Sequence, residues 1–238
     1  MPVIGGSSVD EIMFDKDLVR ATRPLIGRRP MQGLRTIGPA DPPIPTNPAK
    51  LLSFGADMSV PDLVTRDVLA SFERVRSRLF GRLEGLTDAE YLWEPVGDSL
   101  SIRPGDDGVF RVATLFPEAV TGVPDPVTTI AWRIWHIGNL CLRGYVIYFF
   151  EDVPDLGDRH EWPGTAKEGV QALAEDWERF ISRLAALGDK RLLAPTGIGP
   201  DSWADETYLK LALHALDEVA HHGGEIGLLR DLYLREGV

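Results

Sequence analysis

The chain has 238 residues, of which 44% are hydrophobic and 26% charged, an ordinary globular composition that excludes wholesale disorder and fibrous or collagen-like classes. Asp and Glu outnumber Lys and Arg by 36 to 25, so the formal net charge is -11 at pH 7. A charge of this sign repels phosphate backbones, and we do not expect a nucleic acid partner.

Cysteine content and hydropathy bear on the compartment. Cys141 is the one cysteine, so the chain cannot form an intramolecular disulfide, and a reducing compartment fits. The first residues, MPVIGGSSVDEIMF, lack the basic start and the long apolar stretch of a secretory signal. No segment approaches about 18 uninterrupted apolar residues, the length that a membrane-spanning helix needs. We therefore expect a cytoplasmic protein that does not enter the membrane.

Residues 1–58 differ in composition from the rest of the chain. They contain eight prolines and six glycines, and their apolar residues follow neither a helical nor a strand period. Pro-rich segments favour extended conformations and cannot supply all the hydrogen bonds of a helix. We predict an irregular extension over residues 1–58, followed by a folded domain over residues 59–238.

The folded domain is predicted to begin with a long helix. Its apolar residues have helical spacing from about residue 60 to residue 86. Thr87 and Glu90 then form a capping box for a short second helix. A long segment rich in Gly, Pro and Asp follows, which we interpret as a loop with short strands around GVFRVATLF.

Three further long helices complete the predicted domain. One begins at residue 128 or 129 and keeps an apolar face to about residue 151. The next begins at the capping box of Thr165 and Glu168 and stops at a glycine, residue 188. Ser202, Asp205 and Glu206 introduce the last, which runs to about residue 235. This pattern predicts an all-α fold, an antiparallel four-helix bundle.

The last helix carries three of the five histidines within nine residues. At about 100° per residue, Glu218, His222, Glu225 and His214 share one stripe of this helix. A solvated helix face is the plain alternative explanation. The glycine pair at 223–224 weakens that alternative, because each glycine costs on the order of 1 kcal/mol in a helix interior and suits a face that a ligand or backbone approaches closely.

His136 is a polar residue one turn into the strongly apolar segment AWRIWHIGNL. Considered alone, His136 is interpreted as a hydrogen-bonded core residue. Together with a carboxylate and an imidazole four residues apart on another helix, it completes a set of three metal ligands. Three ligands leave coordination positions open, as in catalytic zinc sites, and two histidines with one carboxylate also suit iron(II). The metalloprotease motif H-E-x-x-H is absent.

These segments resemble the DinB-like superfamily of metal-binding four-helix bundles, in particular its branch of mycothiol-dependent maleylpyruvate isomerases and related thiol transferases. TTIAWRIWHIGN is similar to the start of the family's second helix, and EVAHHGGEIGLLRDLY is similar to its fourth. RLEGLTDAEYLWEP resembles the end of its first helix and the following turn. The resemblance covers roughly residues 60–236, and glutamate followed by histidine in the fourth helix is the pattern of the isomerase branch.

The resemblance implies that His136, Glu218 and His222 bind one divalent metal, with zinc as the first expectation and iron or nickel as alternatives. His221 and His214 offer a competing ligand set that a small register shift would select, and they are otherwise candidate partners that orient the ligands. The implied chemistry is activation of a low-molecular-weight thiol, such as mycothiol, for S-transfer to a small electrophilic substrate or for its isomerisation.

Further residues near these ligands have candidate roles. Asn139 and Arg143 lie one and two turns beyond His136, where they are placed to face a substrate carboxylate or amide; hydrogen bonds between helices or to solvent are the alternative. Glu225 is a candidate partner that orients a metal histidine. Cys141 lies about 140° around an ideal α-helix from His136, so we expect it to point away from the metal and into the core.

Two other functions stay open at this point. One is a non-enzymatic DinB-like protein that binds a metal or a small molecule and forms a homodimer. The other is a hydrolase in which the metal activates a water molecule.

Overall fold

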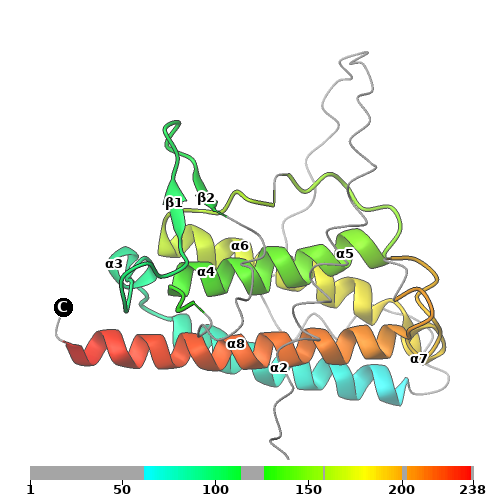
Figure 1. Ribbon diagram of the computed structural model, residues 1–238. Coiled ribbons are helices and arrows are strands. Elements are labelled where there is room, and N and C mark those ends of the chain that lie inside the picture. The colour runs from blue at the N-terminus through cyan, green and yellow to red at the C-terminus, as the bar shows by residue number, and fades with distance from the viewer. Residues whose placement is uncertain (1–61, 114–125, 158, 200–202, 237–238) are drawn as a thin grey trace, which may run out of the picture.

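The computed structural model describes residues 62–113, 126–157, 159–199 and 203–236. The predicted extension over residues 1–58 lies outside these ranges, so the division of the chain into two parts stays a prediction. The described chain is mostly helical, with one two-stranded sheet (Figure 1). Its elements, in chain order, are α2 (Leu63–Leu83), α3 (Asp88–Tyr91), β1 (Ile102–Pro104), β2 (Phe110–Val112), α4 (Ile130–Trp135), η2 (His136–Arg143), α5 (Gly144–Phe149), α6 (Ala166–Ala185), α7 (Gly188–Leu192) and α8 (Tyr208–Glu236).

Three predicted helix starts are confirmed by their capping hydrogen bonds. The hydroxyl groups of Thr87, Thr129 and Thr165 each accept a hydrogen bond from the backbone N–H three residues later. These bonds satisfy donors that the first turn of a helix leaves free. Gly188 follows the end of α6 as predicted, but with a φ of 61° it also opens the short helix α7.

The start of α2 is capped from a distant part of the chain. The carboxylate of Asp189 in α7 accepts hydrogen bonds from the backbone N–H groups of Val64 (3.2 Å) and Thr65 (2.8 Å). Asp62 in turn accepts one from the N–H of Asp189 (2.9 Å). The backbone hydrogen bond of Thr65 is the main cause that lowers the pKa of Asp189 below its ordinary value. These reciprocal bonds fasten the first turn of α2 to α7.

The long helices pack around an aromatic core. Helix α8 runs alongside α2 and also packs against α4 and η2, while α6 packs against α4 and η2 (Figure 1). Phe72 of α2 meets the rings of Trp177 and Phe180 of α6, with ring centroids 6.0 and 5.8 Å apart.

Among the described residues, every helix is too short or too polar to span a membrane.

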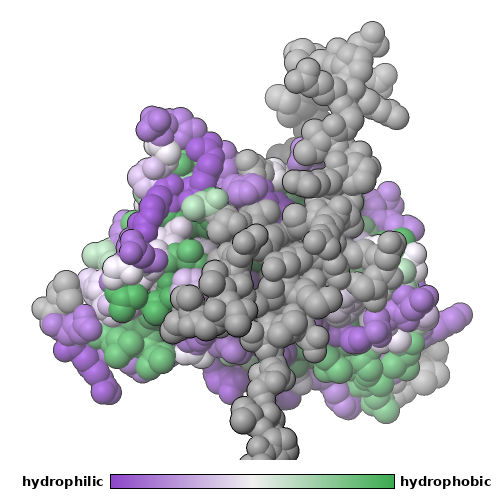
Figure 2. All heavy atoms as spheres, in the orientation of Figure 1, coloured by the Kyte–Doolittle hydropathy of each residue, from purple (hydrophilic) through white to green (hydrophobic). Residues whose placement is uncertain are grey.

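The loop before α4 contains a small hairpin. Strands β1 and β2 pair antiparallel, with Ile102 opposite Val112 and Pro104 opposite Phe110. Strand β2 lies in the segment predicted to form strands. The hairpin projects from the helices (Figure 1), and hydrophilic residues gather on it (Figure 2).

A π-helix interrupts the segment from Ile130 to Phe149, which the sequence predicts as a regular α-helix. In η2 the N–H of Gly144 donates to the carbonyl of Asn139, five residues earlier rather than four. The wider turn changes which side chains share a face of this segment. Residues five apart are about 50° apart at roughly 4.4 residues per turn, rather than about 140° apart in an α-helix.

Arg159 supports the π-helix from the loop that follows α5. Its guanidinium donates to the carbonyl oxygens of Asn139 (3.3 Å) and Leu140 (2.9 Å) and to the hydroxyl of Tyr148 (3.1 Å). Gly144 leaves the room that this requires, because a Cβ at this position would lie 2.9 Å from Nη2 of Arg159. Arg159 therefore satisfies backbone acceptors in the part of the segment where the regular helical pattern is broken.

Replacing Arg159 by Met should lower the free energy of unfolding by about 1–3 kcal/mol, because two buried carbonyl groups each lose a donor. Urea unfolding followed by circular dichroism measures this change. Arg66→Met is the control, since the Arg66 side chain is 63% exposed, and it should alter stability by no more than about 0.5 kcal/mol. Equal stability of the two variants would contradict the supporting role of Arg159.

Candidate metal centre

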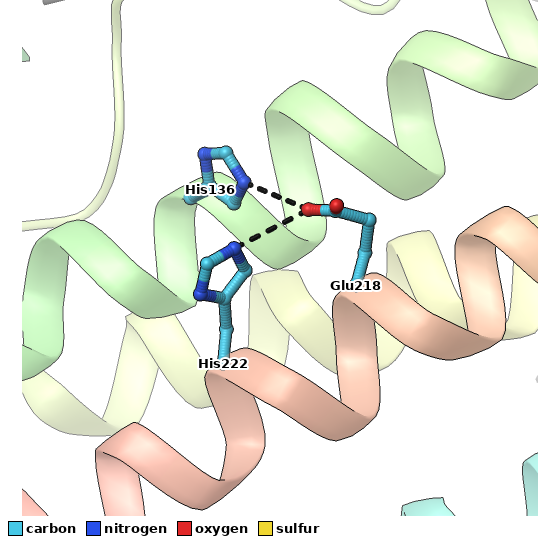
Figure 3. A group of neighbouring side chains, drawn as sticks. All are labelled: His136, Glu218 and His222. Carbon is cyan, nitrogen blue, oxygen red and sulfur yellow. Dashed lines mark hydrogen bonds and ion pairs between the residues drawn. The ribbon is translucent and has the colours of Figure 1, made fainter. Parts of the chain in front are cut away.

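Three buried side chains converge between η2 and α8 (Figure 3). His136 is the first residue of η2, and Glu218 and His222 lie one turn apart on α8. The Nε2 atoms of His136 and His222 are 3.2 and 3.3 Å from the same oxygen, Oε2 of Glu218. All three ligand atoms lie within 4.8 Å of one another, and no residue of the three is more than 7% exposed. The structure thus brings together the three predicted metal ligands.

The two imidazoles are oriented by different contacts. The ring of His136 stacks on Trp132 at a centroid distance of 5.1 Å, and its buried Nδ1 has no hydrogen-bond partner among the described residues. Nδ1 of His222 lies 2.6 Å from Oε2 of Glu225, whose carboxylate is also paired with Arg133 at 2.9 Å. Glu225 therefore occupies the position predicted for a residue that orients a metal histidine.

The distances from the two imidazole nitrogens to the carboxylate oxygen suit a tetrahedral ion. Two atoms bound about 2.0 Å from a tetrahedral zinc ion are about 3.3 Å apart. The two nitrogens of this group lie 3.2 and 3.3 Å from the carboxylate oxygen. Two imidazole nitrogens and one carboxylate oxygen also form a donor set that zinc and iron(II) accept. The three residues therefore fit a divalent metal.

The protein environment keeps His136 neutral and Glu218 ionised, which are the protonation states that bind a metal. Burial lowers the pKa of His136 to about 4, which keeps its imidazole neutral near pH 7. Burial by itself would raise the pKa of Glu218, but hydrogen bonds from His136 and His222 outweigh it and hold the pKa below its ordinary value. Burial acts to lower the pKa of His222, whereas hydrogen bonds to Glu218 and Glu225 raise it above its ordinary value. Protons therefore compete with a metal mainly at His222.

The competing histidines lie outside the buried group. Nδ1 of His214 is 2.8 Å from the hydroxyl of Tyr145. The side chain of His221 is 51% exposed, and its Nε2 lies 3.3 Å from Oε1 of Glu225. With His222 and Glu225, His221 forms a second, more exposed group of ligand atoms. On α8, Glu218 and His222 are therefore the residues that contribute to the buried group.

The structure places the two predicted substrate-binding residues in hydrogen bonds within the protein. Nε of Arg143 donates to both carboxylate oxygens of Asp176 on α6, at 2.9 and 3.1 Å. Oδ1 of Asn139 accepts a hydrogen bond from Arg159 at 3.4 Å. The contact of Arg143 joins two helices, as the alternative expected, whereas Asn139 bonds to a loop residue; neither residue belongs to the buried ligand group.

The expectation for Cys141 is wrong in one part: the residue lies in the buried core as expected, but it does not point away from the candidate ligands. Its sulfur is 3.6 Å from Oε2 of Glu218, the oxygen that faces both histidines. The expectation assumed α-helical geometry, whereas both residues lie in a π-helix, in which residues five apart are about 50° apart around the axis. A local signal was present in the glycines at 138 and 144, where a Cβ would lie 2.9 Å from Trp162 and Arg159.

The glycine pair of α8 meets α2. Gly223 and Gly224 line a groove of about 520 Å³ between the two helices, together with Val75 and Leu79. A Cβ on Gly223 would lie 3.6 Å from Leu79, which is an ordinary contact distance. A Cβ on Gly224 would meet nothing within 4 Å, so the close approach of a backbone or ligand that the sequence predicts at this pair is not observed.

The comparison with protein families agrees with this arrangement. The family model of the DinB superfamily matches residues 71–226, a span that contains all three converging residues. This span is more than half of the chain, and the protein belongs to the DinB superfamily. Neither a curated protein nor a solved structure gave a match.

Two adjacent histidines allow a matched test of the buried group. Replacing His222 by Ala should abolish metal retention, whereas His221→Ala should retain one ion per chain, because only His222 belongs to the buried group. Elemental analysis of protein purified without a metal-affinity tag measures the bound metal. If His221→Ala loses the ion while His136→Ala keeps it, the ion occupies the exposed group and the assignment fails.

Glu225→Gln should weaken metal binding by about 10- to 100-fold, because Nδ1 of His222 loses its carboxylate partner. Competition with a chromophoric chelator measures the affinity. Glu73→Gln removes the same charge from an exposed position of α2 and should leave the affinity unchanged. Equal affinities of the two variants would show that Glu225 does not orient His222.

Proposed function

We propose that the protein is a metal-dependent enzyme that activates a low-molecular-weight thiol for transfer to a small electrophilic substrate, or for isomerisation of that substrate. The observation that carries this proposal is the convergence of His136, Glu218 and His222, with both imidazole nitrogens at tetrahedral ligand spacing from the Glu218 oxygen. We further propose that α2, the α4–α5 segment, α6 and α8 form an antiparallel four-helix bundle, as in the family that the sequence resembles.

Zinc is the metal that we propose, since its preferred geometry agrees with the spacing. A divalent metal bound by these residues would lower the pKa of a coordinated thiol or water and so supply a nucleophile near neutral pH. The thiol is supported by the resemblance to the isomerase branch, in which glutamate precedes histidine by four residues. A coordinated water, and with it a hydrolase, is the alternative.

The residues of the chain would hold and orient this centre. Glu218 supplies the negative charge, and the two histidines supply neutral nitrogen ligands. The pairing of His222 with Glu225 fixes its tautomer, because Nδ1–H is donated to the carboxylate and Nε2 faces the centre. Trp132 holds the ring plane of His136 by stacking.

The burial of the ligand side chains favours a second candidate function, metal binding without catalysis. His136 and His222 are each 7% exposed and Glu218 is 4% exposed, so the side chains leave little of their own surface to a substrate. A protein that binds the metal without catalysis, alone or as a homodimer, agrees with this burial. Metal content is expected in both cases, and thiol consumption distinguishes them.

A screen for thiol consumption tests the proposed activity. The metal-loaded protein is incubated with mycothiol, glutathione or another small thiol and a panel of electrophiles, and the free thiol is followed with time. We expect Glu218→Gln to lose metal retention and thiol transfer together by at least about 10-fold, because a neutral amide is a poorer ligand. Asp217→Asn, the neighbouring exposed position, should retain both.

Two outcomes would contradict the proposal. A Glu218→Gln variant with full metal occupancy and full activity would show that the carboxylate is not part of the chemistry. A metal-loaded wild-type protein that consumes none of the thiols would favour the non-enzymatic candidate.

A further inference from the structure

The buried thiol of Cys141 shares its neighbour with the two metal histidines. Its sulfur lies 3.6 Å from Oε2 of Glu218, and the residue is 2% exposed. The same oxygen lies 3.2 Å from His136 and 3.3 Å from His222. Three side chains thus surround one carboxylate oxygen, and Cys141 is the one for which the proposed function gives no role.

The backbone explains why the thiol reaches this point. His136 and Cys141 are five residues apart in the π-helix η2, and ideal π-helical geometry places such residues about 50° apart around the axis. An α-helix would have turned the thiol about 140° away from His136. The hydrogen bonds from Arg159 to the carbonyls of Asn139 and Leu140 support the wider turn. The position of the thiol therefore depends on the π-helix and on the hydrogen bonds of Arg159, which is not one of the ligands.

The sulfur has the spacing of a metal ligand relative to the carboxylate. A sulfur bound about 2.3 Å from zinc and an oxygen bound about 2.0 Å from it are about 3.5 Å apart in a tetrahedral site. The observed separation between Cys141 and Glu218 is 3.6 Å. Cys141 lies outside the three residues whose ligand atoms are all within 4.8 Å of one another, so its sulfur would have to move closer to the imidazole nitrogens when a metal binds.

Charge balance supports a fourth ligand that is anionic. A divalent metal bound by Glu218 and two neutral histidines carries a net charge of about +1 in a buried site, and burying an unbalanced charge is costly. Arg133 and Glu225 carry opposite charges and are paired with each other, so they do not supply the missing negative charge. A thiolate at Cys141 would bring the centre to neutrality.

We propose that Cys141, as a thiolate, is a fourth protein ligand of the metal centre. This inference rests on the proposed function, because it requires a metal at His136, Glu218 and His222. The thiol proton passes to solvent as the sulfur–metal bond forms, and no oxidant or reductant is involved. Zinc sites can expand to five ligands, so a fourth protein ligand does not prevent an external thiol from binding.

Cobalt(II) reports directly on sulfur ligation. The metal-free full chain is loaded with cobalt(II) in a buffer without thiols, and its absorption spectrum is recorded. We expect a sulfur-to-cobalt charge-transfer band in the near ultraviolet, together with visible bands that report bound cobalt. Since Cys141 is the one cysteine of the chain, no other residue can supply a thiolate.

Cys141→Ser is the matched variant. It should lose the near-ultraviolet band, keep the visible bands and bind cobalt about 10-fold or more weakly in competition with a chelator. A wild-type protein that binds cobalt without the near-ultraviolet band would overturn the proposal and leave Cys141 as a hydrogen-bond donor to Glu218. If no cobalt binds at all, the metal centre of the proposed function fails as well. If the variant does not fold, the wild-type spectrum alone decides.

Discussion

An ionised carboxylate buried between two helices is the constraint on which this structure depends. Glu218 is 4% exposed, and burying its charge is costly unless donors or cations surround it. Imidazole nitrogens from both helices supply that environment, and Glu225 and Arg133 in turn hold one of the imidazoles. The packing of α8 against α4 and η2 is therefore tied to a polar group that an apolar interface would not tolerate alone.

The π-helix determines which side chains the carboxylate meets. An unbroken α-helix over the same residues would have kept His136 near α8 and turned Cys141 into the core. The wider turn keeps both near Glu218. The cost of the irregular backbone is offset outside the centre, where Arg159 binds carbonyls and Gly144 leaves space for its guanidinium. Residues distant from the ligands thus influence the composition of the candidate metal site.

Local patterns made much of this structure predictable, and non-local contacts account for the rest. The threonine caps of α3, α4 and α6 depend on residues three positions apart, and Glu218 and His222 depend on helical spacing. The π-helix depends on a guanidinium about twenty residues further along the chain, and the start of α2 depends on Asp189. Hydrogen bonds from side chains so far along the chain do not produce a periodic sequence pattern, so they could not be predicted from the sequence.

The separation of the ligands along the chain has a consequence for folding. His136 and Glu218 are 82 residues apart in the sequence, so an ion that joins them closes a large loop. Loop-closure entropy grows with the logarithm of loop length, and a cross-link over such a distance restricts the unfolded chain considerably. An unfolded chain offers no preformed site, so the free energy of ion binding adds to the free energy of folding. The bound ion would act as a removable cross-link between α8 and the middle of the chain.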